Sequence, residues 1–115
     1  MTDLVYKILR PAEWSGAQAT GVFTGSRDDA RDGFVHLSAA HQVRGVCERY
    51  FADEGALVLL TIEAARLGSA LKWETSHKGE AYPHLYGPLT LALVKSIADF
   101  RRVDGRCLIF PPEIP

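Results

Sequence analysis

The most informative segment of the chain is Asp32-Gly33-Phe34-Val35-His36-Leu37-Ser38, in which a histidine lies between residues that favour burial. A second stretch, Tyr82-Pro83-His84-Leu85-Tyr86-Gly87-Pro88, has the same character. Side chains alternate between the two faces of an extended strand. Alternation places Phe34, His36 and Ser38 opposite Val35 and Leu37, and it places Tyr82, His84 and Tyr86 opposite Pro83 and Leu85. The sequence therefore predicts two histidine faces, rimmed by aromatic rings and hydroxyls, that line one pocket.

Short apolar segments on either side of these stretches predict further strands. Residues 4–9 alternate, residues 57–62 form the continuous apolar run of a central strand covered on both faces, and residues 71–75 form a short strand. Residues 89–98 alternate as well, and Asp104-Gly105 predicts a hairpin turn before a returning strand at 106–110. Pro83 indicates an edge strand or an ordered loop, because proline donates no backbone hydrogen bond.

One principal helix is expected after the first histidine stretch. Ser38 is a suitable N-cap, and the stripe Val43, Val46, Cys47 and Tyr50 has the spacing of a buried helix face. Pro11 begins a shorter helix over residues 11–17, with Trp14 as its anchor, and residues 21–32 are interpreted as a loop or a frayed helical turn. Together these elements predict a small α+β fold with a mostly antiparallel sheet.

Length and composition narrow the class of protein. The 115 residues suffice for one domain, 1–115, and are too few for two. With 47% hydrophobic residues, 23% charged residues and a net charge of -1, the chain resembles an ordinary soluble globular protein, and no basic excess favours a nucleic-acid partner. No signal peptide is recognised, and the apolar stretch 56–62 is too short to cross a membrane. Cys47 and Cys107 match no zinc or redox motif, so reduced thiols in a cytoplasmic protein are expected; the oligomeric state stays open.

The two histidines are the leading candidates for chemistry. The helix expected after His36 would bring free backbone N–H groups to the imidazole, which suits an anion, a phosphate or a ribose hydroxyl. The alternative is a buried histidine tied to a backbone carbonyl. His84 is flanked by Pro83, Gly87 and Pro88, and such a rigid loop often holds ligand groups. The alternative there is a turn whose aromatic residues attach it to the core.

Two carboxylates could complete the site. Glu74 follows Trp73, and a carboxylate against an indole is expected to have a raised pKa and to act as an acid or a base. The alternative is a solvent-facing strand residue. Glu80, on the polar segment before His84, is a second candidate. No metal ligands are assigned, since the chain lacks an HExxH or paired-cysteine motif, and His36, His84 and Glu74 would bind a metal only if the fold brought them together.

The two histidine stretches, together with Leu71-Lys72-Trp73-Glu74 and with Gly79-Glu80-Ala81, resemble the bacterial and plant family called domain of unknown function 952. The resemblance covers nearly the whole chain, and the family has no established reaction. That family is remotely similar to the ADP-ribosyltransferase-like fold, which implies a split sheet and NAD as the cofactor.

The remote resemblance also implies roles for individual residues. His36 would hold the ribose near the nicotinamide, and Tyr86 would stack on the nicotinamide ring. A glutamate near the end of such folds usually engages the ribose, but Glu74 precedes Tyr86 here, and Glu113 lies in a proline-rich tail. His84 is similar to the extra histidine of the RNA 2′-phosphotransferase branch.

Three functions follow for a pocket holding His36, Ser38, Glu74, His84 and Tyr86. The first is an ADP-ribosyl- or phosphotransferase-like enzyme acting on NAD or another nucleotide; its catalytic residues would be His36, Glu74 and His84, and its ligand-binding residues His36, Ser38 and Tyr86. The second is a catalytically silent module that binds a nucleotide or a small anionic metabolite, which the missing third glutamate favours. The third is a metal-assisted hydrolase, or a partner-binding domain without chemistry.

Overall fold

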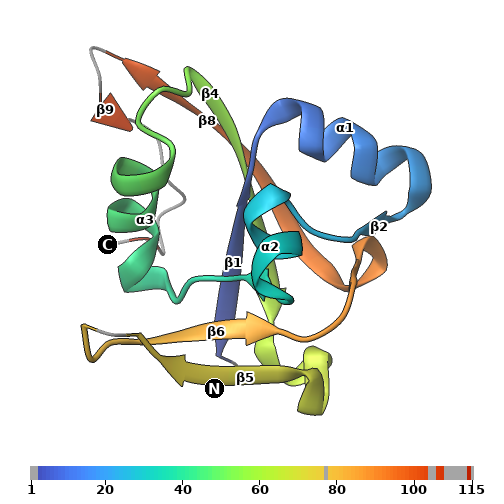
Figure 1. The fold of residues 1–115 in the computed structure, drawn as a ribbon. Helices are drawn as coiled ribbons and strands as arrows, with labels where there is room; N and C mark the ends of the chain where they lie inside the picture. Colours follow the sequence, from blue (N-terminus) through green and yellow to red (C-terminus); the bar gives the residue numbers. More distant parts are fainter. Residues whose placement is uncertain (1–2, 77, 104–105, 108–113, 115) are drawn as a thin grey trace.

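The computed structural model of the chain describes residues 3–76, 78–103, 106–107 and 114, and it confirms a small α+β fold (Figure 1). With η marking a 3₁₀ helix, the elements are β1 (Leu4–Leu9), α1 (Pro11–Thr20), β2 (Val22–Phe23), α2 (Arg27–Asp32), β3 (Val35–His36), η1 (Ala40–Gln42), α3 (Val43–Tyr50), β4 (Ala56–Glu63), η2 (Ala64–Ala70), β5 (Leu71–Thr75), β6 (Ala81–Leu85), β7 (Leu89–Thr90), η3 (Leu91–Leu93), β8 (Val94–Val103) and β9 (Arg106–Cys107). Among these described helices, none has the length and apolar character needed to span a membrane.

The strands of the described residues pair antiparallel and form three sheets. The strand orders are β1-β4-β8-β9, β3-β6-β5 and β2-β7. In Figure 1, β5 and β6 run across one end of β1. A bridge links these two regions: the backbones of Tyr6 in β1 and Ser38, just after β3, exchange two hydrogen bonds of 2.8 Å. The sheet that carries both histidines is therefore attached to the first strand.

The central strand β4 separates two hydrophobic clusters. It lies between β1 and β8 and is buried along both faces, as its continuous apolar run predicts. In β1, alternation sends Val5 and Leu9 into the cluster shared with α1, β3 and β6, and it sends Tyr6 and Ile8 into the cluster shared with α3. Lys7 follows the alternation of Val5 and Leu9 and is also buried. The fold thus places one lysine beneath the histidine sheet.

The alternation predicted for both histidine stretches is confirmed. Val35 and Leu37 are buried in the first cluster, and so is Leu85 from the second stretch. The opposite faces of β3 and β6 present the two histidines, and the antiparallel register sets His36 directly opposite His84. Local sequence pattern is enough here, because a strand with one apolar face has only one way to bury it.

The position predicted for Pro83 is wrong, because β6 is the middle strand of its sheet, between β3 and β5. The Leu37 N–H donates to the Pro83 carbonyl at 3.0 Å, so the proline nitrogen faces the same side, at a point where β3 has already ended. The sheet loses a single ladder hydrogen bond there. A middle strand accepts proline at this position because its neighbour is only two residues long.

The expectation of one principal helix after Ser38 is wrong in two respects. Among the described helices the longest is α1, which continues past residue 17 to Thr20, whereas α3 spans only Val43–Tyr50. Ser38 is not an N-cap, since its backbone pairs with Tyr6 and η1 begins two residues later. The Ala39 N–H is instead satisfied by the Gln42 side chain, at 2.9 Å from Oε1. Trp14 does pack against the first cluster, as predicted.

Two segments contain more elements than their sequences predict. Residues 21–32 include β2 and α2, and residues 89–98 include β7, η3 and the start of β8. The β2–β7 pair has two residues in each strand, too few for an alternation to be recognised. Strands β8 and β9 are antiparallel, but Asp104-Gly105 and residues 108–110 lie outside the described part of the chain.

Cys47 is buried in α3 and is disulfide-bonded, so the expected reduced thiol is wrong for this residue. Helix α3 packs against β9, a proximity that the distance between the cysteines in the sequence does not reveal. The side chain of Cys107 lies outside the described residues.

Candidate functional site

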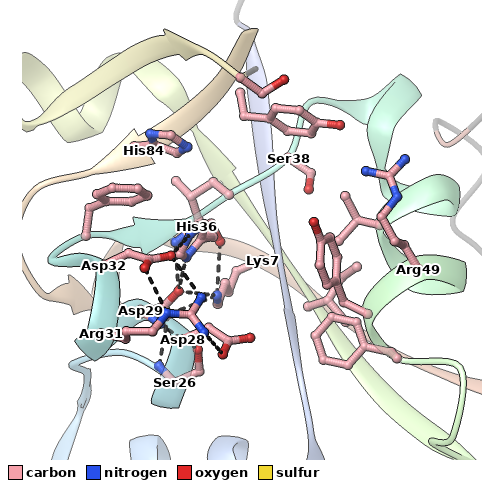
Figure 2. Close-up of a pocket in the computed structure, with 18 of the residues that line it drawn as sticks. Lys7, Ser26, Asp28, Asp29, Arg31, Asp32, His36, Ser38, Arg49 and His84 are labelled. Carbon is pink, nitrogen blue, oxygen red and sulfur yellow. Dashed lines mark hydrogen bonds and ion pairs between the residues drawn. The ribbon is translucent and has the colours of Figure 1, made fainter. Parts of the chain in front are cut away.

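A cavity of about 580 Å³ lies between α2, β3, α3 and the β5–β6 hairpin (Figure 2). This volume falls in the range of roughly 300–1,000 Å³ that small-molecule sites occupy. The lining combines carboxylates, imidazoles, cations and aromatic rings; it includes Asp28, Asp29, Asp32, His36, Ser38, Arg49, Tyr50, Tyr82 and His84. In Figure 2 the three aspartates lie to the left, and Arg49 lies to the right.

His36 and His84 lie side by side at this cavity. Their ring centroids are 5.6 Å apart, and the rings meet edge to face at 70°. Phe34 stacks on His84 with centroids 4.0 Å apart, and its centroid is 4.6 Å from that of His36. The two histidine faces therefore line one cavity, as the alternation predicts.

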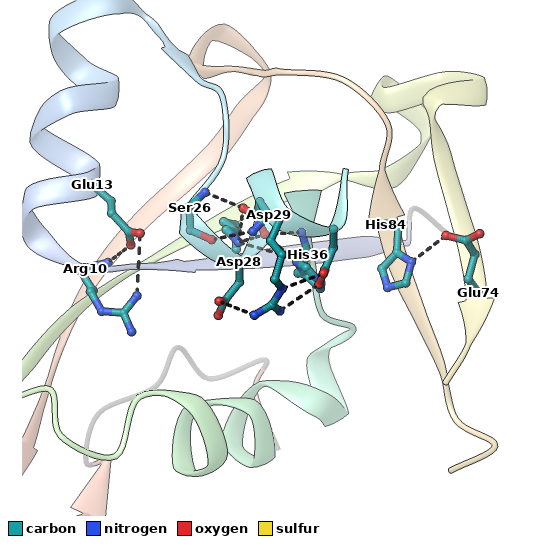
Figure 3. A network of polar contacts seen from close by, with 11 residues as sticks. Arg10, Glu13, Ser26, Asp28, Asp29, His36, Glu74 and His84 are labelled. Carbon is teal, nitrogen blue, oxygen red and sulfur yellow. Dashed lines mark hydrogen bonds and ion pairs between the residues drawn. The ribbon is translucent and has the colours of Figure 1, made fainter. Parts of the chain in front are cut away.

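A carboxylate behind His84 fixes the orientation of its ring. Glu74 Oε1 lies 2.7 Å from His84 Nδ1 (Figure 3). The same oxygen accepts a hydrogen bond of 2.6 Å from the Tyr86 hydroxyl. An ionised carboxylate only accepts hydrogen bonds, so the network assigns the hydrogen to Nδ1. Among the described residues, no protein group bonds Nε2, which leaves that nitrogen for a ligand.

The raised pKa expected for Glu74 is wrong. The Tyr86 hydroxyl, followed by His84, holds the pKa of Glu74 below its usual value, and the same hydrogen bond raises the pKa of Tyr86. Neighbouring residues in a strand point to opposite faces, so Glu74 turns away from the Trp73 side of β5. Its partners come instead from β6 and the residue after it, which the sequence alone did not connect to it.

A second carboxylate holds His36 at two points. Asp29 Oδ1 accepts the His36 backbone N–H at 3.0 Å and lies 2.6 Å from His36 Nδ1, while Asp32 Oδ2 lies 3.0 Å from Nε2. Both ring contacts are hydrogen bonds only in the imidazolium, whereas the neutral ring satisfies one of them. His36 is therefore fixed more tightly than His84.

A buried ion pair holds Asp29 in turn. Lys7 Nζ donates to Asp29 Oδ2 and to the His36 carbonyl, each at 3.0 Å, and the two side chains are 7% and 2% exposed. Burial raises the pKa of Asp29, but the His36 hydrogen bond and the Lys7 charge outweigh it, so the net pKa lies well below its usual range. Burial also lowers the pKa of Lys7, against the attraction of Asp29.

The start of α2 explains how Asp29 reaches this position. Ser26 Oγ accepts the Asp29 N–H at 3.2 Å, and Asp29 Oδ2 accepts the Ser26 N–H at 2.9 Å, which together form a capping box. Gly25 precedes it with φ 127°, and a Cβ at Gly25 would lie 2.9 Å from Asp29 Cβ. Only glycine allows the chain to pass this close to the carboxylate.

Sequence reasoning missed Asp29 and Lys7 as site residues. The Ser26-x-x-Asp29 spacing is a known signal for a helix start, so it could have located α2. Lys7 was visible as a lysine in an otherwise apolar strand. Neither signal could have revealed that both residues meet beneath His36, because that contact depends on tertiary packing.

The predicted site residues divide into two groups. His36, Ser38 and His84 line the cavity, whereas Glu74 and Tyr86 do not: Glu74 contacts His84, and Tyr86 donates to Glu74. The helix start expected beside His36 is displaced to Ala40. Glu80 lines the cavity and accepts a hydrogen bond of 2.8 Å from Gln42 Nε2. In the described part of the chain, no three His, Cys, Asp or Glu side chains are grouped to hold a metal ion.

The comparisons with known proteins agree in pointing to one family. The family model described as "Protein of unknown function (DUF952)" matches residues 8–97. The crystal structure of protein CC0527 from Caulobacter crescentus, a structural genomics target, is 46% identical, with a TM-score of 0.86 over 91% of this chain and 93% of that chain. The solution NMR structure of CC0527 is 45% identical, with a TM-score of 0.81 over 90% of each chain. No curated protein matches the sequence. The matched residues include both histidines and their carboxylates, and this chain belongs to the DUF952 family.

Proposed function

We propose that this protein is an enzyme that binds a nucleotide-type ligand, such as NAD or ADP-ribose, and acts on it with His84 as the acid–base group. The observation that carries this proposal is the chain of contacts from Tyr86 through Glu74 to His84, which leaves Nε2 at the cavity. A carboxylate that fixes the tautomer of a histidine is a recurring arrangement in general acid–base catalysis.

The lining of the cavity supports a nucleotide as the ligand class. Phe34, Tyr50 and Tyr82 offer aromatic surface for a base or a nicotinamide ring. The exposed carboxylates Asp28 and Asp32 are suited to accept hydrogen bonds from ribose hydroxyls. The remote similarity of the family to the ADP-ribosyltransferase-like fold favours the same class of ligand and the transfer of an ADP-ribosyl or phosphoryl group.

In the proposed reaction the two histidines have different roles. His36, fixed by Asp29 at Nδ1, orients the ribose through Asp32, which lies 3.0 Å from its Nε2 and accepts a hydrogen bond from a ribose hydroxyl. His84 Nε2 accepts a proton from the attacking group or returns one to the leaving group, and ionised Glu74 stabilises the imidazolium that forms. Tyr86 orients Glu74 through its hydroxyl and does not stack on the ligand, since it does not line the cavity.

Binding is tested by thermal shift with NAD, NADP and ADP-ribose. A ligand at about 100 times its Kd is expected to stabilise the protein by about 2.7 kcal/mol, because it binds only the folded state. No shift with any of the three would contradict a nucleotide pocket.

Catalysis is tested by following NAD hydrolysis and 2′-phosphate transfer with the wild type and His84→Gln. The variant is expected to lose roughly 10²- to 10⁴-fold in kcat, since it has no titrating group, and to keep its thermal shift. His41→Gln is the matched control, because His41 does not line the cavity. Equal turnover by His84→Gln and the wild type would rule out His84 as the acid–base group.

A second candidate is a module that binds a nucleotide or a small anion without reaction. The observation that favours it is the pair of carboxylates on His36, Asp29 at Nδ1 and Asp32 at Nε2, which leave that ring no vacant nitrogen. This candidate predicts thermal shifts with nucleotides, unchanged by His84→Gln, and no turnover of any of them.

A further inference from the structure

The charges that line the cavity are divided between two walls. The α2 wall carries three carboxylates, Asp28, Asp29 and Asp32. Its two cations are engaged by them: Lys7 Nζ is 3.0 Å from Asp29, and Arg31 is 3.4 Å from Asp28 and 2.9 Å from Asp32. This wall therefore has no spare cation for an anionic ligand apart from His36, which already faces two carboxylates.

The opposite wall of the cavity carries a cation, Arg49, that has no carboxylate partner among the described residues. Arg49 lines the cavity from α3, across from the acidic residues in Figure 2, and no carboxylate of the described chain forms an ion pair with it. Its neighbours are two tyrosines: interaction with Tyr82 raises the pKa of Arg49, and the Tyr50 ring centroid lies 5.8 Å from its Cζ. A guanidinium has five donors, so these neighbours leave donors available.

The β5–β6 hairpin adds to the same side of the cavity. Ser76 and Lys78 line it there and offer a hydroxyl and a second cation with no ion pair among the described residues. The carboxylate on this hairpin, Glu80, is engaged elsewhere: it accepts from Gln42 Nε2 at 2.8 Å and lies 3.5 Å from His41 Nε2. This half of the cavity therefore carries two cations and one carboxylate, Glu80, whereas the other half carries three carboxylates that engage its cations.

We propose that Arg49 forms an anion subsite that binds a phosphate group of the ligand, with Lys78 as a second cation of the same cavity, so that the sugar part lies against His36 and His84. Guanidinium groups bind phosphate through two parallel hydrogen bonds, which fixes direction as well as position. The subsite deepens the proposed function and rests on it for the nucleotide, but the phosphate contact itself is separately testable.

The experiment measures Kd by calorimetry for ADP-ribose, inorganic pyrophosphate and adenosine with the wild type, Arg49→Gln and Arg49→Lys. Arg49→Gln is expected to weaken binding of ADP-ribose and pyrophosphate by about 10- to 100-fold, with adenosine unchanged. Arg49→Lys keeps the charge without the paired donors and is expected to lie between the two. Arg44→Gln, on the same helix but not at the cavity, is the matched control and is expected to bind like the wild type.

The outcomes separate this inference from the proposed function. Pyrophosphate binding that depends on Arg49, without binding of ADP-ribose or adenosine, would support the anion subsite and contradict the nucleotide. ADP-ribose binding that is equal in the wild type and Arg49→Gln would overturn the subsite and leave the nucleotide pocket standing. Equal weakening by Arg44→Gln and Arg49→Gln would also overturn it, since only the net charge of α3 would then matter.

Discussion

His36 and His84 face each other across one strand pair, yet their surroundings are reversed. The His36 side chain is 38% exposed, and its carboxylate, Asp29, is 2% exposed. The His84 side chain is 16% exposed, and its carboxylate, Glu74, is 41% exposed. Each pair therefore joins a more exposed group to a less exposed one, in opposite order.

This difference reflects how the carboxylate of each pair is held by the rest of the protein. Asp29 receives Lys7, the Ser26 backbone and His36, so it belongs to the folded framework and His36 is attached to it. Glu74 is held by a tyrosine hydroxyl and a histidine at the surface, where water competes. Similar sequence stretches thus lead to one histidine whose ring contacts two carboxylates and one whose Nε2 has no hydrogen-bond partner among the described residues.

Among the changes that test this comparison of the two histidines, removal of the buried Asp29 carboxylate should have the largest effect on stability. Asp29→Ala leaves Lys7 as an unpaired buried charge, so we expect a loss of about 3–5 kcal/mol in the free energy of unfolding, measured with urea. Asp28→Ala, on the same helix but exposed, is the control and should change stability by no more than about 0.5 kcal/mol. A loss below about 1 kcal/mol for Asp29→Ala would mean that the ion pair does not support the fold.

Low pH should lower the stability of the protein through protonation of Asp29, the carboxylate that holds His36. The native pKa of Asp29 lies below its ordinary value of 3.8, so under acidic conditions the unfolded chain binds more protons than the native protein. The stabilising contribution is complete above about pH 4 and decreases as the pH falls further. Urea titrations between pH 5 and pH 2 should show this decrease in the wild type and a flatter profile in Asp29→Asn. Parallel profiles would contradict the assignment.

Crowding the turn beside Asp29 should have an intermediate effect. Gly25→Ala places a Cβ 2.9 Å from Asp29 Cβ at φ 127°, and we expect a loss of about 1–3 kcal/mol and a weaker hold on His36. Gly16→Ala, in α1 with open space around it, is the matched control and should stabilise the protein by about 0.5–1 kcal/mol. Thermal unfolding measures both; stabilisation by both would show that the turn can relax.

Removing the Tyr86 hydroxyl, which donates to the exposed Glu74 carboxylate, should have the smallest effect on stability. Tyr86→Phe removes one surface hydrogen bond, so we expect a change within about 0.5 kcal/mol. The pKa of Glu74 should rise toward its ordinary value, because the hydrogen bond from Tyr86, the largest cause of the lowered pKa, is lost. Carboxyl NMR titration measures the shift, with Tyr50→Phe as the control. An unchanged Glu74 titration would mean that Tyr86 does not orient this carboxylate.

Much of the fold could be predicted because its signals are local. The strands β1 and β5, the buried β4 and the alternation through His36 and His84 each follow from the order of apolar and polar residues. Element lengths and edges were less predictable: β2 and β7 are too short to show a period, and Pro83 is tolerated in a middle strand only because β3 ends early.

The order of apolar and polar residues dictates which strand faces are buried, and therefore that both histidines point to the opposite, common side. Alternation in strands is a property of neighbouring residues, which is why it could be read from the chain. The partners of each histidine, by contrast, depend on tertiary packing. Lys7 and Asp29 are 22 positions apart, and Glu74 reaches His84 through strand pairing, so their contacts depend on how the sheets pack. Packing, rather than the local pattern, placed one imidazole between two carboxylates and left the other with one ring nitrogen that no described residue bonds.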